Sequence, residues 1–407
     1  MDDLLLLIHR IPYPPNKGDK IRSYRLLQHL AQHYRVHLAT FVDDEDDWQH
    51  VARVEALCAS SYFARLNPRM ARVRSLGALL GNRALSFDYY RDAALGAWVD
   101  TAVRTHHIGR VVVFSSPMAQ YAEALVQARR VIDFCDVDSD KWRQYADKKS
   151  WPMSALYAHE ARQLLRYERK VAASFDASLL VSEPEAQLLR RLAPESAQRI
   201  GFVNNGVDTA YFTPHGIDGK PYDNPYSAGD QALVFCGAMD YWPNVDAVSW
   251  FARELFPAIR ARHPQARFII VGARPSAEVQ QLASLPGVMV TGTVPDVRPF
   301  VAWASVCVAP LRIARGIQNK VLEAMSMART VVVTPQALEG ITAQAGRDLL
   351  LGEDGAAFQA CVDAALTAPD PAMGQAARAL VETLYGWSAN LAPVVSLLEQ
   401  RPNERPQ

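Results

Sequence analysis

The chain has 407 residues, which is enough material for two domains of ordinary size. Apolar residues make up 49% of it and charged residues 21%, a balance that excludes disordered, collagenous and coiled-coil proteins. Residues 1–205 carry 28 lysines and arginines against 24 aspartates and glutamates, and residues 206–407 carry 15 against 19. Net charges of +4 and −4 are too small to indicate nucleic-acid binding.

Cysteine usage and hydropathy indicate the compartment. The five cysteines are widely spaced and form no CxxC or Cys/His cluster, so we expect neither a disulfide framework nor a zinc site. No apolar run approaches the roughly 18 to 20 residues of a membrane-spanning helix. We therefore expect a cytoplasmic protein without a signal peptide or membrane span.

Short apolar runs alternate with longer amphipathic stretches along the whole chain. Runs that are apolar on both faces and separated by helices are typical of parallel sheets covered on both sides. One helix between them is predicted over 245–259 from apolar residues at helical spacing. The sequence therefore predicts an α/β fold with two doubly wound sheets. The predicted strands lie at 4–8, 36–42, 111–115, 131–134 and 177–182, then at 232–237, 268–273, 288–292, 306–311 and 330–334.

A segment rich in Asn, Gly, Pro and Asp separates the two sets of strands. We expect an N-terminal Rossmann-like domain over 1–205, a linker over 206–231 and a C-terminal Rossmann-like domain over 232–384. Residues 385–407 are expected to form a helix that returns to the N-terminal domain. Ligands of such sheets bind beyond the carboxyl ends of the strands, so the ligand site is expected in a cleft between the domains.

The loop after the first strand leads into a helix that is expected to start near Asp19 or Lys20. Gly18 permits close approach of the backbone, and the N–H groups at a helix start favour an anion. The alternative is an ordinary loop followed by a solvated helix face that carries Lys17, Lys20, Arg22 and Arg25.

Residues 306–335 contain the strongest candidate site. A strand is followed by a loop with Arg315 and Gly316, and then by a helix from about Ile317 that carries Lys320 and Glu323. An ammonium in the first turn can face a diphosphate together with the helix dipole. A carboxylate one turn later can accept both hydroxyls of a ribose. The alternative is an intrahelical Lys/Glu contact on a surface helix.

Candidate acceptor residues follow strands of the N-terminal half. Aspartates cluster at the end of the strand at 131–134 and could bind hydroxyls of an acceptor, hold a divalent cation, or only cap the next helix. His9 follows the first strand and could equally be an ordinary loop histidine. The full set is His9, Ser115, Ser116, Asp133, Asp136, Asp138, Asp140 and Trp142.

Residues 65–83 read as an amphipathic helix with a basic face. Such a helix could rest on an anionic membrane surface, or its arginines could form an ordinary solvated face. The residues concerned are Arg65, Arg69, Arg72 and Arg74 beside Leu76, Leu79 and Leu80.

The stretch GIQNKVLEAMSMARTVVVT at 316–334 resembles the donor-site helix of family-four retaining glycosyltransferases of GT-B architecture. Two further segments, 131–146 and 235–251, resemble the sugar transferases associated with PEP-CTERM exopolysaccharide loci. The resemblance implies a nucleotide sugar as substrate, no cofactor and no metal. It implies catalytic roles for Lys320, Arg315 and Asp138, and donor contacts by Gly18, Asp19, Gly237, Val294, Gly316, Ile317, Gln318, Asn319, Lys320 and Glu323.

The chain also departs from that family's pattern. Arg315 stands where many members have a glutamate near the transferred sugar, and Gly237 is not followed by the usual Arg and Lys. The expected function is transfer of a hexose-type sugar from a nucleotide diphosphate to a polysaccharide or lipid-linked acceptor, by a same-face, internal-return mechanism. The alternatives are a nucleotide-sugar epimerase and a degenerate GT-B subunit that only binds.

Overall fold

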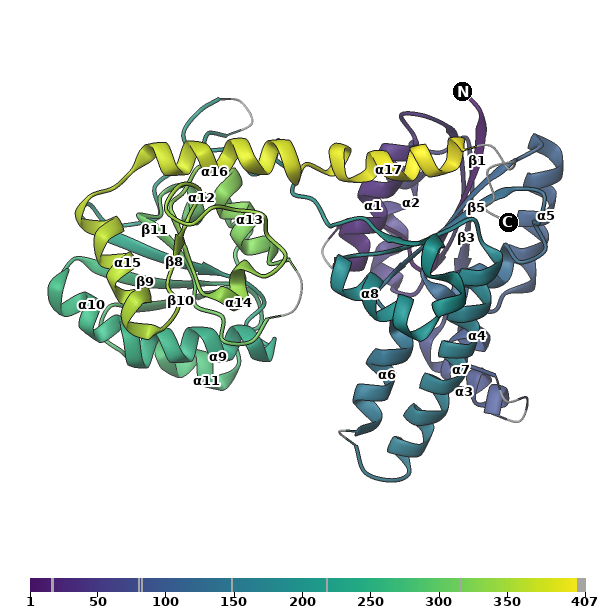
Figure 1. Ribbon diagram of the computed structural model, residues 1–407, viewed down its shortest axis with the longest axis horizontal. Helices are drawn as coiled ribbons and strands as arrows, with labels where there is room; N and C mark the ends of the chain where they lie inside the picture. The colour runs from purple at the N-terminus through teal and green to yellow at the C-terminus, as the bar shows by residue number, and fades with distance from the viewer. Residues whose placement is uncertain are drawn as a thin grey trace. The chain divides into compact units, whose positions relative to one another are not determined.

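The computed structural model describes residues 1–15, 18–79, 81, 83–147, 149–216, 219–314 and 317–400. The chain divides into two compact units (Figure 1). Unit 1 comprises Met1–Asn204 and Leu391–Gln407, and unit 2 comprises Asn205–Asn390. No helix among the described residues is long and apolar enough to cross a membrane.

Unit 1 is built on a parallel sheet in the order β3-β2-β1-β4-β5-β6-β7. Its central strand β1 has five consecutive residues buried, which is what a strand covered by helices on both faces requires. The strands are β1 Asp3–Ile8, β2 Arg35–Val42, β3 Ser60–Arg65, β4 Arg110–Phe114, β5 Arg129–Cys135, β6 Ala177–Leu180 and β7 Ile200–Phe202.

Helices cover both faces of this sheet, and two of them, α6 and α7, extend away from it (Figure 1). The helices of unit 1 are α1 Gly18–Leu30, α2 Val51–Glu55, α3 Pro68–Ser75, α4 Leu85–Tyr89, α5 Ala93–His106, α6 Asp138–Asp147, α7 Met153–Ser174 and α8 Glu183–Leu192.

Unit 2 repeats the plan with a parallel sheet in the order β10-β9-β8-β11-β12-β13. The strands are β8 Gln231–Cys236, β9 Ala266–Val271, β10 Val288–Gly292, β11 Val306–Ala309, β12 Val331–Val333 and β13 Leu350–Leu351. The helices are α9 Trp242–Trp250, α10 Phe256–Arg262, α11 Ala277–Leu282, α12 Arg298–Ala302, α13 Asn319–Ser326, α14 Pro335–Leu338, α15 Gly355–Thr367 and α16 Pro371–Leu384.

All ten predicted strands are present, and the prediction of two doubly wound sheets is confirmed. Three strands were missed: β3, β7 and β13. They are the outer strands of their sheets or very short, so they lack the continuous apolar run that marks a central strand.

The predicted single helix at 245–259 is instead α9, a π-helical turn over Phe251–Leu255, and α10. Pro257 lies in the first turn of α10 and has no N–H to continue the hydrogen bonds of α9, so the helix cannot run through unbroken. The apolar face survives the break, since Val248, Phe251 and Ile259 are all fully buried.

The last helix, α17 (Trp387–Glu399), belongs to unit 1 from Leu391 onward. Its end is fixed there by the carboxylate of Glu399, which accepts hydrogen bonds from the Tyr34 hydroxyl at 2.6 Å and from Arg110 at 2.8 Å. The final described residues are therefore held against the amino end of the unit 1 sheet.

The predicted amphipathic helix at 65–83 is shorter than expected. Arg65 is the last residue of β3, so the chain is still extended at that point. Its side chain pairs with Glu45. Arg74 donates to the backbone oxygens of Asp88 and Tyr89 and is therefore engaged in packing. The helical part that remains is α3, followed by a 3-10 turn over Leu76–Leu79; Leu80 lies outside the described residues.

Candidate active site

Both sheets reverse their strand order at one point, between β1 and β4 in unit 1 and between β8 and β11 in unit 2. In doubly wound sheets a crevice opens at the carboxyl ends of the strands at such a point, and ligands bind there. His9 follows β1 and Ser115 follows β4, while Gly237 follows β8. The fold thus brings predicted site residues to the reversal point of each sheet.

In unit 2 the centre of this edge is a hydrogen-bonded chain of three residues. The Nζ of Lys320, in the first turn of α13, donates to Oδ1 of Asn244 at 3.0 Å. The Nδ2 of Asn244 donates in turn to the backbone oxygen of Ala238 at 2.9 Å. Asn244 is only 5% exposed, so it fixes the ammonium of Lys320 relative to the loop after β8.

Burial lowers the pKa of Lys320 to about 8, although the nearby Glu323 and Cys236 act in the opposite direction. Its ammonium also lies 5.1 Å from the centre of the Phe235 ring. Its hydrogen-bond partner Asn244 is an uncharged amide. Among the described residues the hydrogen bond of this ammonium goes to that neutral amide, so a phosphate that arrived at this edge could add a charged one.

Glu323 lies one turn after Lys320 along α13, as predicted. Burial raises the pKa of Glu323 to about 7, and the charge of Lys320 opposes that rise. Near neutral pH the carboxyl is therefore present in both protonation states and can donate to or accept from a hydroxyl. The two residues share a small cavity of about 10 Å³ with Cys236 and Cys307.

Gly237 is required by its neighbours. A Cβ atom on Gly237 would lie 2.7 Å from Nδ2 of Asn244, and one on Gly272 would lie 1.7 Å from the backbone oxygen of Gly237. Both glycines let the loop after β8 pass close to β9 and to Asn244. The structure thus gives this glycine a packing role; its predicted contact with the donor stays a prediction.

The other predicted donor residues of unit 2 are Val294 and the residues next to the start of α13. Arg315 and Gly316 lie outside the described residues. Gln318 is the residue before the helix, and Asn319 is its first residue. The buried Oδ1 of Asn319 has no hydrogen-bond partner among the residues that the structure describes. Ile317 lies just before α13, and Val294 lies on the loop after β10. Both are half-buried against the core of unit 2.

Asn244 is the residue that sequence reasoning missed. It precedes Val248 by four positions, so it lies on the same helical stripe as the buried apolar residues of α9. A polar residue on a core-facing stripe must find hydrogen-bond partners, and this was the available signal.

In unit 1 the reversal point is lined by His9. Its ring stacks on Phe114 with centroids 5.8 Å apart and meets Tyr90 edge-on at 5.7 Å. Its Nε2 lies 3.5 Å from Oδ2 of Asp19, and Arg10 donates to the same oxygen at 3.1 Å. Burial would raise the pKa of Asp19, but His9 and Arg10 outweigh it and hold the pKa below its usual range.

The predicted first helix starts at Gly18, beside Asp19. A Cβ atom on Gly18 would meet nothing within 4 Å, so packing within the protein does not require glycine there. The idea of a solvated face on α1 is wrong for two residues. Lys20 is buried and pairs with Asp47, and Arg22 is fully buried.

One member of the acidic cluster, Asp133, is the hydrogen-bond partner of Arg22. The Nε of this arginine donates to Oδ2 of Asp133 at 2.7 Å inside the core, so Asp133 is a structural partner and does not face a ligand. Asp140 accepts hydrogen bonds from Arg143 and Gln144 on its own helix. These two members of the predicted set are thus engaged elsewhere.

The remaining pair, Asp136 and Asp138, stays at the edge of the sheet. Lys141 bridges them, with Nζ at 3.1 Å from Asp136 and 3.3 Å from Asp138. Burial raises the pKa of Asp138, and His9 acts against that rise, which places His9 and Asp138 in one electrostatic neighbourhood. Trp142 packs against Tyr157 of α7 at 5.1 Å.

Ser115 and Ser116 differ sharply in environment. Ser115 follows β4 and has a positive φ of 77°. Its backbone N–H donates to the backbone oxygen of Asp133. Ser116 is fully buried, and its Oγ has no hydrogen-bond partner among the described residues. Only Ser115 is partly open to solvent.

One group of residues in the described part of the chain could hold a metal ion: Asp3, His37 and His106. It lies at the start of β1, the end of the sheet opposite to His9. Asp3 already accepts from His37 at 2.7 Å and from Arg35 at 3.0 Å, and the rings of His37 and His106 are stacked. A cation would have to displace these contacts.

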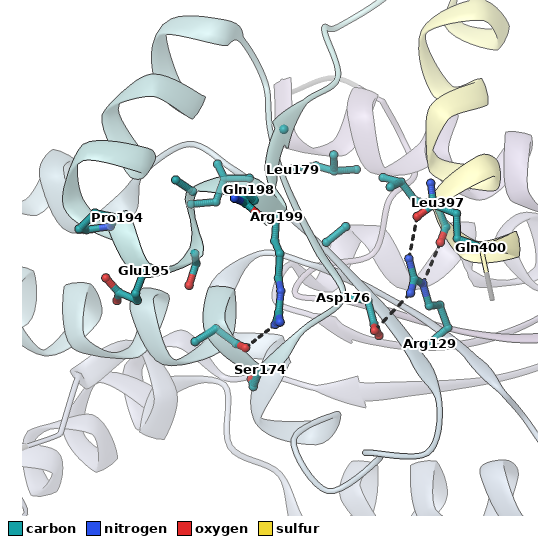
Figure 2. A pocket seen from close by; sticks show the side chains of 16 residues that line it. Arg129, Ser174, Asp176, Leu179, Pro194, Glu195, Gln198, Arg199, Leu397 and Gln400 are labelled. Carbon is teal, nitrogen blue, oxygen red and sulfur yellow. Dashed lines mark hydrogen bonds and ion pairs between the residues drawn. The ribbon is translucent and has the colours of Figure 1, made fainter. Parts of the chain in front are cut away.

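A cavity of about 880 Å³ also lies at the amino end of the unit 1 sheet (Figure 2). Figure 2 shows Arg129 pointing toward the end of α17, where it donates to the Leu397 oxygen at 2.9 Å and to Gln400 at 2.9 Å. A third bond reaches Asp176 at 3.3 Å. This arginine holds the C-terminal helix, and its cavity lies away from the strand ends where ligands bind.

A family model matches about one third of the chain. Residues 230–368, or 139 of the 407, match the family described as glycosyl transferases group 1. This segment runs from the start of β8 to the end of α15 and includes Asn244, Lys320 and Glu323. The chain has no significant sequence match among curated proteins.

Solved structures match both units. The chain is similar to sucrose-phosphate synthase from Thermosynechococcus elongatus, with 16% identity, 98% of each chain covered and a TM-score of 0.66. It is similar to a glycosyltransferase from Rickettsia africae at 12% identity, 98% coverage of each chain and a TM-score of 0.66. Anabaena HepE in complex with UDP matches at 13% identity, with 98% of this chain and 99% of that one covered and a TM-score of 0.62. The predicted GT-B fold class is thus confirmed.

Proposed function

We propose that the protein is a retaining glycosyltransferase of exopolysaccharide biosynthesis, which moves a hexose-type sugar from a nucleotide diphosphate to a polysaccharide or lipid-linked acceptor. The observation that carries the proposal is the Lys320–Asn244 pair at the reversal point of the unit 2 sheet, with Glu323 one turn away. It lies inside the segment that matches glycosyl transferases group 1. Complexes of HepE with UDP and with UDP-glucose support a nucleotide sugar as the donor.

The proposed chemistry assigns the leaving group to unit 2. The bond between the sugar carbon and the diphosphate oxygen breaks, and negative charge grows on that oxygen. Lys320 stabilises this charge because Asn244 has already oriented its ammonium. The leaving diphosphate takes the proton of the acceptor hydroxyl, which attacks from the same face of the sugar, so configuration is retained.

The proposed acceptor contacts come from unit 1. Asp138, His9 and Ser115 lie at the carboxyl end of its sheet, and carboxylate and imidazole groups can bind sugar hydroxyls. Exposed Arg69 and Arg72 on α3 are proposed to meet an anionic membrane surface, which would hold a lipid-linked acceptor nearby.

A thermal-shift panel of nucleoside diphosphates and nucleotide sugars tests the donor site. A ligand at 100 times its dissociation constant should add about 2.7 kcal/mol of stability. The Lys320→Ala variant, with unchanged far-ultraviolet circular dichroism, is the matched control and should show a smaller shift. No shift with any nucleotide would contradict the proposal.

Product analysis separates the proposed activity from its rivals. A transferase consumes the donor with acceptor present and forms a new glycoside with the same anomeric configuration. An epimerase converts the donor without acceptor, and a subunit that only binds leaves it unchanged. Either of the last two outcomes would overturn the transferase assignment while leaving nucleotide binding intact.

A further inference from the structure

Helices α6 and α7 form a hairpin that stands out from unit 1 (Figure 1). The buried residues of α7 begin only at Glu160, seven positions into the helix, and Ser139 is the buried residue of α6. The part of the hairpin farthest from the sheet therefore packs mainly on itself. We call residues 147 and 149–153 the hairpin tip.

Most aromatic side chains of the hairpin are explained by its own packing. Trp142, Tyr145 and Tyr157 form a cluster with ring centroids 5.1 to 6.5 Å apart, which holds the two helices together. Trp151 at the tip is different, since it is 81% exposed. No ring contact of Trp151 occurs among the residues that the structure describes.

The surroundings of Trp151 are apolar and charged, and the carboxylate of Asp147 at the tip is already paired with Arg143. Met153 is 41% exposed beside it, and Lys149 is exposed two residues before it. An indole that projects from a convex tip next to an ammonium group is the arrangement by which proteins enter the headgroup region of a bilayer.

A second surface of the same chemistry lies on α3. Met70 and Val73 are each 71% exposed, next to exposed Arg69 and Arg72. This surface is joined to α7, because the Glu160 carboxylate accepts hydrogen bonds from the first turn of α4, which packs on α3. Figure 1 shows α3 and the hairpin at the same end of unit 1.

We propose that the hairpin tip inserts Trp151 and Met153 into an anionic bilayer, with α3 as the second contact. The first residue of α6 is Asp138, at the carboxyl edge of the sheet, and the ten residues of this helix span about 15 Å. The hairpin then acts as a spacer that holds the acceptor side of the site at this distance from the lipid. This purpose rests on the proposed lipid-linked acceptor; the contact itself does not.

Vesicle binding of the full chain tests the contact without donor or acceptor. Vesicles of 30% phosphatidylglycerol and 70% phosphatidylcholine should float the protein at physiological salt, and pure phosphatidylcholine should float much less. We expect Trp151→Ala to weaken partitioning about tenfold and Lys149→Glu to weaken it on the anionic vesicles only. The matched control is Trp242→Ala, which removes a 56% exposed tryptophan from unit 2 and should bind like the wild type.

Brominated lipids locate the inserted residue directly. The wild type should show quenching of its tryptophan emission by bromines near the headgroups, and Trp151→Phe should lose that quenching, while Trp242→Phe should keep it. Equal quenching in both variants, or no flotation of the folded wild type, would overturn the proposal. A dimer that depends on Trp151 and forms without lipid would also overturn it, in favour of contact between copies of this chain. Nucleotide binding in the thermal-shift panel would be unaffected by any of these outcomes.

Discussion

The lowered pKa of Lys320 predicts that the affinity for a nucleoside diphosphate depends on pH. Burial brings this pKa to about 8. The charged form is therefore the main form at pH 7 and a minor form at pH 9. If the ammonium contacts the diphosphate, binding must weaken as the pH rises through 8.

The size of the effect follows from the charged fraction. With a pKa of about 8 the fraction falls from about 0.9 at pH 7 to about 0.1 at pH 9, which is about tenfold in affinity or 1.4 kcal/mol. Glu323, with a pKa of about 7, becomes anionic over the same range and repels the ligand, so it adds to the loss. Cys236 keeps its proton in this range, because burial raises the pKa of its thiol well above the ordinary value.

Isothermal titration calorimetry with UDP at pH 7, 8 and 9 measures the dependence, and Lys320→Arg is the control. Arginine stays protonated throughout, so the variant keeps the charge and should lose the part of the pH dependence that Lys320 causes. At pH 8 the wild type should also take up about half a proton on binding, seen as a heat that varies with the buffer. Equal pH slopes in the wild type and a folded Lys320→Arg that still binds UDP would refute the assignment of Lys320 to the diphosphate.

Four further substitutions each test a single side chain. Lys320→Ala should lower kcat by about 10² to 10³ with a smaller effect on donor affinity. Asn244→Ala should reproduce part of this loss, because the ammonium of Lys320 is then no longer oriented. A wild-type kcat in both folded variants would show that the phosphate site lies elsewhere. Glu323→Ala should cost about 1.5 to 3 kcal/mol of donor binding, measured by calorimetry, with unchanged kinetics counting against a ribose contact. Glu168→Gln should stabilise the protein at pH 8 by on the order of 2 to 4 kcal/mol in urea unfolding. Burial raises the pKa of Glu168 to about 8, so the folded state holds a proton that the unfolded state releases above about pH 4.5, and wild-type stability should fall as the pH rises between these values; a flat profile would contradict this.

The sequence was sufficient to predict the central strands, because a strand that is buried on both faces consists of consecutive apolar residues. The runs at 4–8 and 232–237 are short and apolar on both faces, which is typical of a covered parallel strand. The edge strand β3 could not be found in this way, since five of its six residues are half-buried or exposed. Edge position is set by the order of strands in space, which no local pattern records.

The position of part of the candidate site in the fold was predictable. Lys320 and Glu323 have one-turn spacing after a strand, and the structure places both at the reversal point of the sheet. The partners of Asn244 and Arg22 were not predictable, because they lie 76 and 111 positions away along the chain. Arg22 looked like a surface residue on α1, and only the carboxylate of Asp133 in the core allows it to be buried.

The charges at the two reversal points argue for the proposed division of labour. In unit 1, Arg10 pairs with Asp19 and Asp43, and Lys141 bridges Asp136 and Asp138. The cations of that edge are thus matched by carboxylates, which repel phosphate and can hold hydroxyls. In unit 2, Lys320 donates to a neutral amide, and its neighbour Glu323 is partly protonated at pH 7. An anionic donor is therefore favoured at unit 2, and a neutral acceptor rich in hydroxyls is favoured at unit 1.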